Sequence, residues 1–233
     1  MTENDGPELI ENGPAYEASG LVHRVLVPEG KGPFSTGPHP TAVMIHGRSG
    51  NEDVMWVFRR ALPKDWLVVA PRAIQDDPDG GYSWHPRQKD EWPSLGMFDE
   101  AVSAVVKFIK ALPELYGADP EHIYLMGFSQ GAATAFATAI RHPGLVKAVA
   151  GLVGFMPFDS ESEVAPGVLD GLPVFMAVGL EDDTIPLALS RHCADALRTA
   201  GADLIYGEYE TGHKLNAQGM RELKAWWGER DGE

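Results

Sequence analysis

Short apolar runs alternate with longer segments of helical periodicity along most of the chain. The runs rich in β-branched residues predict strands, which we place at Leu21–Val27, Thr41–Ile45, Leu67–Pro71, His122–Met126, Lys147–Val153, Val174–Val178 and Leu204–Tyr209. The longer segments predict helices at Asp53–Leu62, Phe98–Leu112, Gln130–His142, Leu187–Ala200 and Ala217–Trp227. Because strands and helices alternate from the second strand onward, the pattern indicates an α/β fold with a mostly parallel central sheet and helices on both faces.

Two insertions are longer than the connections usual in such a fold. They cover residues 72–97 and 155–172, and the first contains Tyr82, Trp84 and Trp92. Because long connections often carry binding residues, we expect both insertions to contribute to substrate contact.

Length and composition fit one compact unit. The chain has 233 residues, of which 44% are hydrophobic and 23% charged, the balance of a folded globular protein. We therefore expect a single domain over residues 1–233, with a loosely ordered N-terminal segment over residues 1–17.

The formal net charge is −15. A surface of this sign repels nucleic-acid backbones and anionic lipid headgroups, so we expect neither nucleic acid nor membrane insertion among its interactions. Residues 1–17 lack the features of a signal peptide, and no apolar run approaches membrane-spanning length. The expected location is therefore cytoplasmic.

Cysteine usage and acidic clusters bear on metals and cofactors. The single cysteine, Cys193, excludes an intramolecular disulfide and a cysteine-based metal cluster. Acidic residues gather at positions 76, 77 and 79 and again at 161 and 163, but their spacing fits no metal-binding loop. We interpret them as solvated turns and predict neither a metal nor a cofactor.

The most informative motif is Gly-Phe-Ser-Gln-Gly at residues 127–131. It lies where a predicted strand meets a predicted helix, and Gly-x-Ser-x-Gly in that setting predicts a strained turn that exposes a nucleophilic serine, Ser129. Glycines flank it because the residues two before and two after such a serine approach each other closely. Taken alone, the motif also fits an ordinary glycine-flanked strand end.

A serine hydroxyl needs a base within hydrogen-bond reach and a third group that orients the base. One recurrent chain order places the acid after the serine and the histidine after the acid, which leaves His192 and His213. His192 falls inside a predicted helix. His213 follows the last predicted strand, at the carboxyl edge of the sheet where α/β folds bind ligands, so we predict His213 as the base.

Two neighbouring carboxylates are candidates for the acid. Asp182 and Asp183 lie in the segment that follows the predicted strand Val174–Val178, and so emerge at the same edge. Neighbours in an extended turn point in opposite directions, so only one can meet His213 and the other is a turn or capping residue. Chain position does not separate the two.

The reaction of a serine with a carbonyl also needs donors for the oxyanion that develops. One candidate is the backbone N–H of Gln130, which follows the serine and opens a helix. The second is the backbone N–H of Arg48, in the glycine-rich turn His46–Gly50 after the predicted strand Thr41–Ile45. His46 precedes Ser129 and is in the wrong order for the base, so we expect its imidazole to be structural.

These motifs together resemble the phospholipase/carboxylesterase family of α/β-hydrolases, which includes small bacterial carboxylesterases and acyl-protein thioesterases. The resemblance extends from about His39 to Trp227 and rests on the turn at Ser129, His46-Gly47, Gly179-x-x-Asp182-x-x-Ile185-Pro186 and Gly212-His213. It implies an α/β-hydrolase fold without a large cap domain. The family's acid lies four residues before the proline, which selects Asp182 (186 − 182 = 4).

The resemblance also implies which residues surround the substrate. Residues 80–84, Gly-Gly-Tyr-Ser-Trp, match the family's glycine-rich segment beside the acyl pocket, so Tyr82 and Trp84 become candidate substrate contacts. Arg48 stands where the family commonly has an apolar residue, and we hypothesise that its side chain contacts an acidic or polar leaving group. Relatives in this family are often monomers or dimers, so a monomer or homodimer is expected.

The implied function is hydrolysis of a small-molecule carboxylic ester through an acyl-enzyme on Ser129, with His213 as base and Asp182 orienting it. We expect short to medium acyl chains, because the anionic surface disfavours the acidic membranes where long-chain lipids reside. An acyl thioesterase or lysophospholipase of the same family is the alternative. A second alternative is a binding protein that has the hydrolase fold but no catalytic activity, although such proteins usually lose a triad member.

Overall fold

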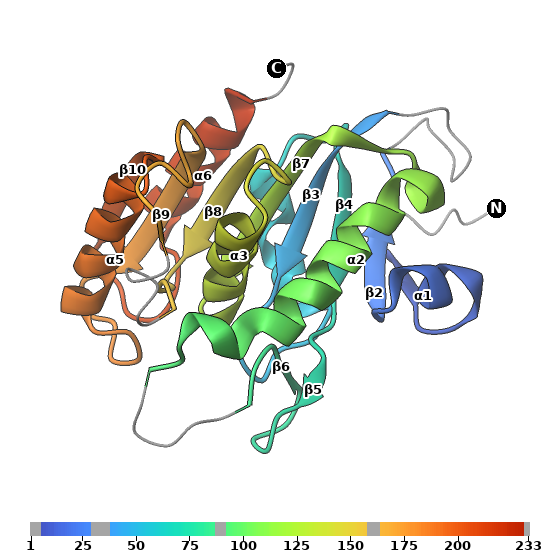
Figure 1. Cartoon of the computed structure of the whole chain (residues 1–233), viewed down its shortest axis with the longest axis horizontal. Helices are drawn as coiled ribbons and strands as arrows, with labels where there is room; N and C mark the ends of the chain where they lie inside the picture. The colour runs from blue at the N-terminus through green and yellow to red at the C-terminus, as the bar shows by residue number, and fades with distance from the viewer. Residues whose placement is uncertain (1–5, 29–37, 87–91, 158–163, 231–233) are drawn as a thin grey trace.

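The computed structural model describes residues 6–28, 38–86, 92–157 and 164–230. At its centre lies an eight-stranded sheet with the order β1-β2-β4-β3-β7-β8-β9-β10 (Figure 1). The strands are β1 (Glu8–Ile10), β2 (His23–Leu26), β3 (His39–Ile45), β4 (Leu67–Pro71), β7 (Ala118–Phe128), β8 (Ala148–Leu152), β9 (Pro173–Gly179) and β10 (Asp203–Tyr209). β1, β2 and β4 pair antiparallel, and every other neighbouring pair in the sheet is parallel.

Helices cover both faces of this sheet (Figure 1). They are α1 (Gly13–Ser19), α2 (Asp99–Tyr116), α3 (Gln130–Arg141), α5 (Leu187–Thr199) and α6 (Ala217–Gly228), with the 3₁₀ helices η1 (Val54–Ala61) and η2 (Leu95–Phe98). α2, α3 and α5 share one buried cluster, whereas η1 and α6 share the other. The mostly parallel sheet between two helical layers confirms the predicted α/β fold class.

Alternation along the strands explains why the sequences of the central strands are apolar. In β3, Val43 and Ile45 pack toward α2 and α3, whereas Ala42 and Met44 pack toward η1 and α6. All four side chains are fully buried. Because both faces of the sheet are covered, the central strands are apolar along their buried parts, which produces the continuous apolar runs, whereas β1 and β10 at the edges keep exposed positions.

The predicted elements agree with the structure except at three places and in the N-terminal segment. The predicted helix Asp53–Leu62 is a 3₁₀ helix, and the helix expected to end at Leu112 continues past Pro113. The first insertion contains a small hairpin of β5 (Gln75–Asp76) and β6 (Tyr82–Ser83).

The expectation of a loosely ordered N-terminal segment is wrong for its described part. Residues 8–10 form β1 and residues 13–17 belong to α1, which ends at a left-handed Gly20 whose N–H donates to the carbonyl of Tyr16. Residues 1–5 lie outside the described residues. The pattern missed β1 and α1 because the segment has few apolar residues from which to read a period.

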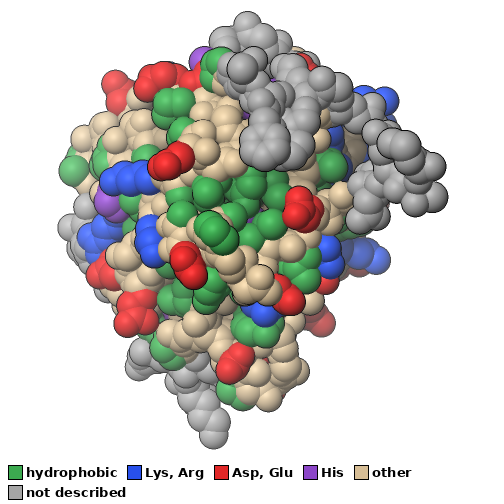
Figure 2. Space-filling view, turned by 90° about the vertical axis from the view of Figure 1, so that its right-hand side faces the viewer, with side chains coloured by type: hydrophobic (Ala, Val, Ile, Leu, Met, Phe, Trp, Pro, Cys, Tyr) green, Lys and Arg blue, Asp and Glu red, His purple; other side chains and the backbone are tan. Residues whose placement is uncertain are grey.

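Charged side chains are spread over the surface rather than gathered into one patch on the face that Figure 2 shows, at the β2 and α1 end of the molecule. Acidic and basic groups lie there among apolar ones. Within the described ranges, the model contains no helix of the length and apolarity needed to span a bilayer.

Candidate active site

Ser129 occupies the turn between the end of β7 and the start of α3. Its φ of 52° and ψ of −118° lie outside the regions that L-residues favour, and its N–H is held by the carbonyl of Leu152 at 2.9 Å. A Cβ at Gly127 would collide with the carbonyl of Gly131, and a Cβ at Gly131 would collide with that of Ile45. The two glycines therefore allow the strained turn to close against β3.

Three side chains from three loops meet at this carboxyl edge of the sheet. The Oγ of Ser129 lies 2.9 Å from Nε2 of His213, and Nδ1 of His213 lies 2.8 Å from Oδ2 of Asp182. The other carboxylate oxygen of Asp182 accepts the N–H groups of Thr184 and Ile185 at 2.8 and 2.9 Å. The structure brings the three predicted residues together in the predicted order.

The choice between the two neighbouring aspartates is visible in their surroundings. The Asp182 side chain is 3% exposed and contacts His213, whereas Asp183 is exposed and accepts a long hydrogen bond from the hydroxyl of Thr184 at 3.4 Å. His192 lies within α5 and is exposed. The alternative acid and the alternative base thus stay away from Ser129.

Backbone contacts hold the acid loop against the histidine loop. The N–H of Glu181 donates to the carbonyl of Thr211 at 3.0 Å, and a Cβ at Gly179 would collide with the carbonyls of Thr211 and Gly212. Gly179 is therefore a close-approach position, which explains why both loops can present their side chains to one point.

The contacts also define the tautomer of His213. A carboxylate can only accept, so Nδ1–H donates to Asp182 and Nε2 is left to accept the hydroxyl proton of Ser129. The ring packs edge-on against Phe128, with a centroid distance of 5.4 Å, and Phe128 packs against Phe58 of η1 at 6.0 Å. The imidazole is thus oriented both by hydrogen bonds and by an aromatic wall.

The two predicted oxyanion donors lie beside Ser129. Gln130 follows Ser129 and opens α3, and a Cβ at Gly47 would touch Phe128 and Ser129, which brings the turn that contains Arg48 against the serine. Among the described residues, neither the Arg48 N–H nor the Gln130 N–H has a hydrogen-bond acceptor. Two backbone donors are therefore available beside the serine.

Trp84 has a different place from the one predicted. The Trp84 side chain is fully buried, so it offers no surface to a substrate; its indole N–H donates to the carbonyl of His46, and its backbone N–H donates to Oε1 of Gln130, each at 2.8 Å. Tyr82 is half-buried, and its N–H donates to the carbonyl of Gly50 at 2.8 Å. Both residues fasten the first insertion to the turn at residues 46–50.

His46 is a structural histidine, as the chain order led us to expect. Its Nε2 accepts the N–H of Ala73 at 2.9 Å, so Nδ1 carries the proton and donates to the carbonyl of Gly47 at 2.6 Å. Burial lowers the pKa of His46 to about 4. The neutral ring therefore serves as a fixed spacer between β3 and the first insertion.

The side chain of Arg48 binds Asp77, one of the acidic residues that we interpreted from the sequence as solvated. Its Nε donates to Oδ2 of Asp77 at 3.1 Å, and the Asp77 side chain is 2% exposed. This buried carboxylate contradicts the interpretation of Asp77 as part of a solvated turn. The available signal was the turn sequence Asp-Pro-Asp-Gly-Gly at residues 77–81, but Arg48 is too distant in sequence for a local pattern to reveal the pair.

The two insertions contact each other close to the nucleophile. Trp92 of the first and Phe155 of the second lie with ring centroids 5.2 Å apart, edge to face. Phe155 follows Gly154, where a Cβ would collide with Ala132 and approach the carbonyl of Ser129. Apolar surface from both insertions therefore adjoins the nucleophile turn.

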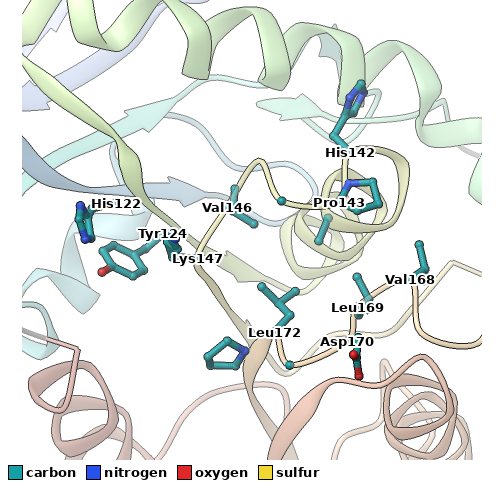
Figure 3. Close-up of a pocket in the computed structure, with 14 residues that line it drawn as sticks. His122, Tyr124, His142, Pro143, Val146, Lys147, Val168, Leu169, Asp170 and Leu172 are labelled. Atoms are coloured by element: carbon teal, nitrogen blue, oxygen red, sulfur yellow. The ribbon is translucent and has the colours of Figure 1, made fainter. Parts of the chain in front are cut away.

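A cavity of about 420 Å³ lies at the opposite, amino edge of the sheet (Figure 3). It is open to solvent and is lined by β7, by the start of β9 and by the connections that lead into β8 and β9, including His122, His142, Lys147 and Asp170. None of the predicted site residues lines it. In the described ranges, no group of three or more His, Cys, Asp or Glu side chains is arranged to hold a metal ion.

The mostly parallel sheet between two helical layers is that of an α/β-hydrolase. The model of the phospholipase/carboxylesterase family matches residues 38–227, so the chain belongs to that family. It resembles a crystal structure of a carboxylesterase from Mesorhizobium loti, with a TM-score of 0.79, 18% identity, and coverage of 95% of this chain and 98% of that one. It also resembles the esterase PE8, with a TM-score of 0.75, 24% identity, and coverage of 88% and 96%.

Curated relatives are similar over parts of their length. NocK of Nocardia uniformis subsp. tsuyamanensis, named as an inferred esterase, is 29% identical over 81% of this chain and 49% of its own length. The carboxylesterase SOBER1 of Arabidopsis thaliana is 24% identical over 47% and 49%. A relative from Oryza sativa subsp. japonica, 28% identical over 47% and 46%, is named a probable inactive carboxylesterase. The chain spans about half the length of the curated relatives it matches.

Proposed function

We propose that the protein is a serine carboxylesterase that hydrolyses small-molecule esters of short to medium acyl chains through an acyl-enzyme on Ser129. The observation that carries the proposal is the series of contacts from Ser129 to His213 at 2.9 Å and from His213 to Asp182 at 2.8 Å. A base within reach of the hydroxyl, and an acid that fixes the base, are what an activated serine requires.

In the first half of the reaction, Oγ of Ser129 attacks the ester carbonyl carbon while its proton moves to Nε2 of His213. The carbonyl oxygen becomes an oxyanion, which the N–H groups of Arg48 and Gln130 stabilise. When the tetrahedral intermediate collapses, the bond to the alcohol breaks and the leaving alkoxide takes the proton from Nε2. The alcohol departs and the acyl group remains on Ser129.

In the second half, Nε2 of His213 accepts a proton from a water molecule that attacks the acyl carbon. The second oxyanion uses the same two donors, and its collapse breaks the bond to Oγ, which takes back the proton. The acid product leaves and Ser129 is restored. Asp182 stabilises the imidazolium formed in each half and keeps its tautomer fixed.

The names of the relatives support an esterase, but membership of the family does not suffice, because one relative is named inactive. The contacts of all three residues in this chain favour an enzyme over a hydrolase-fold binding protein. The preference for short to medium acyl chains is supported by the net charge of −15, which disfavours acidic membranes.

A panel of p-nitrophenyl esters from acetate to palmitate, assayed beside acyl-thioesters and lysophospholipids, tests this function. We expect the highest kcat/KM among the short to medium oxyesters, and no turnover by Ser129→Ala. Faster turnover of palmitate than of butyrate would contradict the chain-length assignment. Faster turnover of thioesters or lysophospholipids would favour the alternative activities of the family, and no turnover of any substrate would contradict the enzyme assignment.

A further inference from the structure

We propose that Asp77 is a positioning residue that sets the direction of the Arg48 N–H by holding both central residues of the turn at residues 47–50. The inference rests on the proposed function, because it gives the Arg48 N–H its role as an oxyanion donor.

The turn at residues 47–50 has a strained backbone, so it needs contacts that keep its conformation. The N–H of Gly50 donates to the carbonyl of Gly47 at 3.2 Å, which closes the turn around Arg48 and Ser49. Ser49 has a φ of 57°, one of three positive values among the described residues other than glycine, and Ser129 is another. A side chain at such a φ is disfavoured. A free turn of this sequence would therefore relax, and the peptide N–H of Arg48 would change direction.

Asp77 contacts both residues at the centre of the turn. Its carboxylate accepts Nε–H of Arg48 at 3.1 Å and the hydroxyl of Ser49, and it also accepts the hydroxyl of Ser83 and the N–H of Asp79. Burial alone would raise the pKa of Asp77, but these hydrogen bonds lower it to about 2. The carboxylate is therefore charged throughout the working range of an esterase, and its grip on the turn does not depend on pH there.

Asp77 is itself fixed by the hairpin of β5 and β6. Its N–H donates to the carbonyl of Gly81 at 2.9 Å, and its carbonyl accepts the N–H of Gly80 at 2.9 Å. Gly81 packs so closely on the backbone of Ser49 that a Cβ there would collide with it. The carboxylate thus acts from a rigid support rather than from a loose loop.

The same hairpin leads into the residue that contacts the second donor. Trp84 directly follows β6, and its N–H donates to the side-chain carbonyl of Gln130 at 2.8 Å. The hairpin of β5 and β6, with the residue that follows it, therefore contacts both Arg48 and Gln130. These contacts fix the separation between the two N–H groups. A preorganised pair of donors of this kind is what stabilises an oxyanion.

The test is Asp77→Asn, which keeps the shape and an acceptor but removes the charge that binds Arg48. We expect kcat for a short p-nitrophenyl ester to fall about 10- to 100-fold with KM within about twofold of the wild type. Affinity for a trifluoromethyl ketone, which forms an oxyanion on the serine, should fall by the same factor. Titration with a phosphonate should still count one reactive serine per chain, which separates misplaced donors from unfolded protein.

A second substitution, Ser49→Gly, distinguishes an effect of Asp77 on the turn from a general effect of Asp77 on stability. Glycine adopts a positive φ without strain, so the turn no longer needs to be restrained. In the Asp77→Asn background, Ser49→Gly should therefore recover about tenfold of the lost kcat. An absence of recovery would overturn the inference that Asp77 acts by holding the turn.

Asp119→Asn is the matched control at the other edge of the sheet. Asp119 accepts Nδ1–H of His122 at 2.7 Å and the N–H of Glu121 at 2.9 Å, and its replacement should leave kcat unchanged. If Asp77→Asn does not fold, Arg48→Lys, which keeps the N–H and the charge but loses the guanidinium geometry, should still lower kcat with KM unchanged.

Wild-type kcat and inhibitor affinity in Asp77→Asn, or in Arg48→Lys where only that variant folds, would overturn the inference while leaving the proposed function intact. Failure of the wild-type protein to turn over any ester is a different outcome, and overturns the proposed function.

Discussion

The two edges of the central sheet differ in what they contain. At the carboxyl edge, the backbone is strained at Ser129 and Ser49. Several glycines there stand where a Cβ would collide with the backbone of a neighbouring segment, and the buried carboxylate of Asp77 binds the turn that contains Arg48. At the amino edge lies the cavity of about 420 Å³, with His142, Lys147 and Asp170 exposed on its lining.

The proposed site lies at the edge opposite the cavity, so cavity volume did not guide the proposal. Strained φ values and buried polar contacts cost free energy, and they persist where the surrounding structure holds them for a purpose. The amino edge has the volume, but the described non-glycine residues with a positive φ all lie at the carboxyl edge. Folds of the α/β class place their ligands at that edge.

The largest expected difference between the two edges concerns Ser129. Ser129→Ala should lower kcat about 10⁶-fold, since the remaining site can no longer form an acyl-enzyme. Lys147→Ala, in the lining of the amino-edge cavity, should leave kcat within about twofold. Steady-state hydrolysis of a short ester by both variants measures this difference. A comparable loss of kcat in Lys147→Ala would place the reaction at the amino edge, contrary to the proposal.

A smaller effect is expected at the acid. Asp182→Asn should lower kcat about 10⁴-fold, because an amide in contact with Nδ1 favours the wrong tautomer of His213. The adjacent Asp183→Asn is the matched control, and its exposed side chain predicts a change of less than about twofold. If the two variants were equally active, the assignment of the acid would be wrong.

Close packing at the carboxyl edge predicts a difference in stability between two glycines. Gly131→Ala would place a methyl group against the carbonyls of Ile45 and His46, and should lower the free energy of unfolding by about 3 kcal/mol or more. Gly144→Ala, in the lining of the amino-edge cavity, meets no atom within 4 Å but has a φ of 81°, and should cost about 1 kcal/mol. Urea unfolding measures both, and equal losses would contradict the packing argument.

The smallest effect concerns pH and the buried His46. Its pKa is lowered by burial from 6.5 to about 4, so the unfolded chain takes up a proton first as the pH falls. Its contribution to stability is therefore complete above about pH 6.5, is lost between about 6.5 and 4, and stays constant below. Between pH 8 and pH 5 the loss should be about 2 kcal/mol.

Urea unfolding of the wild type and of His46→Gln at several pH values measures this contribution. The variant should lose about 2 kcal/mol less than the wild type over the same pH range. An identical pH dependence in both proteins would show that His46 is not held neutral in the folded state.

Much of the fold was predictable because burial on both faces of the sheet leaves a continuous apolar run in the central strands. The run at residues 67–71 gives β4 with the bounds that the structure has. The segment at residues 8–19 has no such signal, and η1 has helical periodicity but a different hydrogen-bond pattern. Periodicity reports which residues are buried, and it does not distinguish one helical hydrogen-bond pattern from another.

The candidate triad was predictable because chain order and the carboxyl edge restrict which loops can meet. The roles of Trp84 and Asp77 were not. An aromatic residue near a candidate site has the same sequence pattern whether it lines a pocket or supports a turn. An acidic residue in a turn sequence is interpreted as solvated, because nothing in the local pattern indicates burial. Only long-range contacts, to His46 and Gln130 for Trp84 and to Arg48 for Asp77, separate these roles.

Labelling by an organophosphate tests most directly whether Ser129 is the activated nucleophile. The native protein should take up one equivalent, located by mass spectrometry on Ser129, and Ser129→Ala should take up none. Asp182→Asn should label much more slowly than Asp183→Asn. An unlabelled native protein, or a label on another residue, would contradict the account.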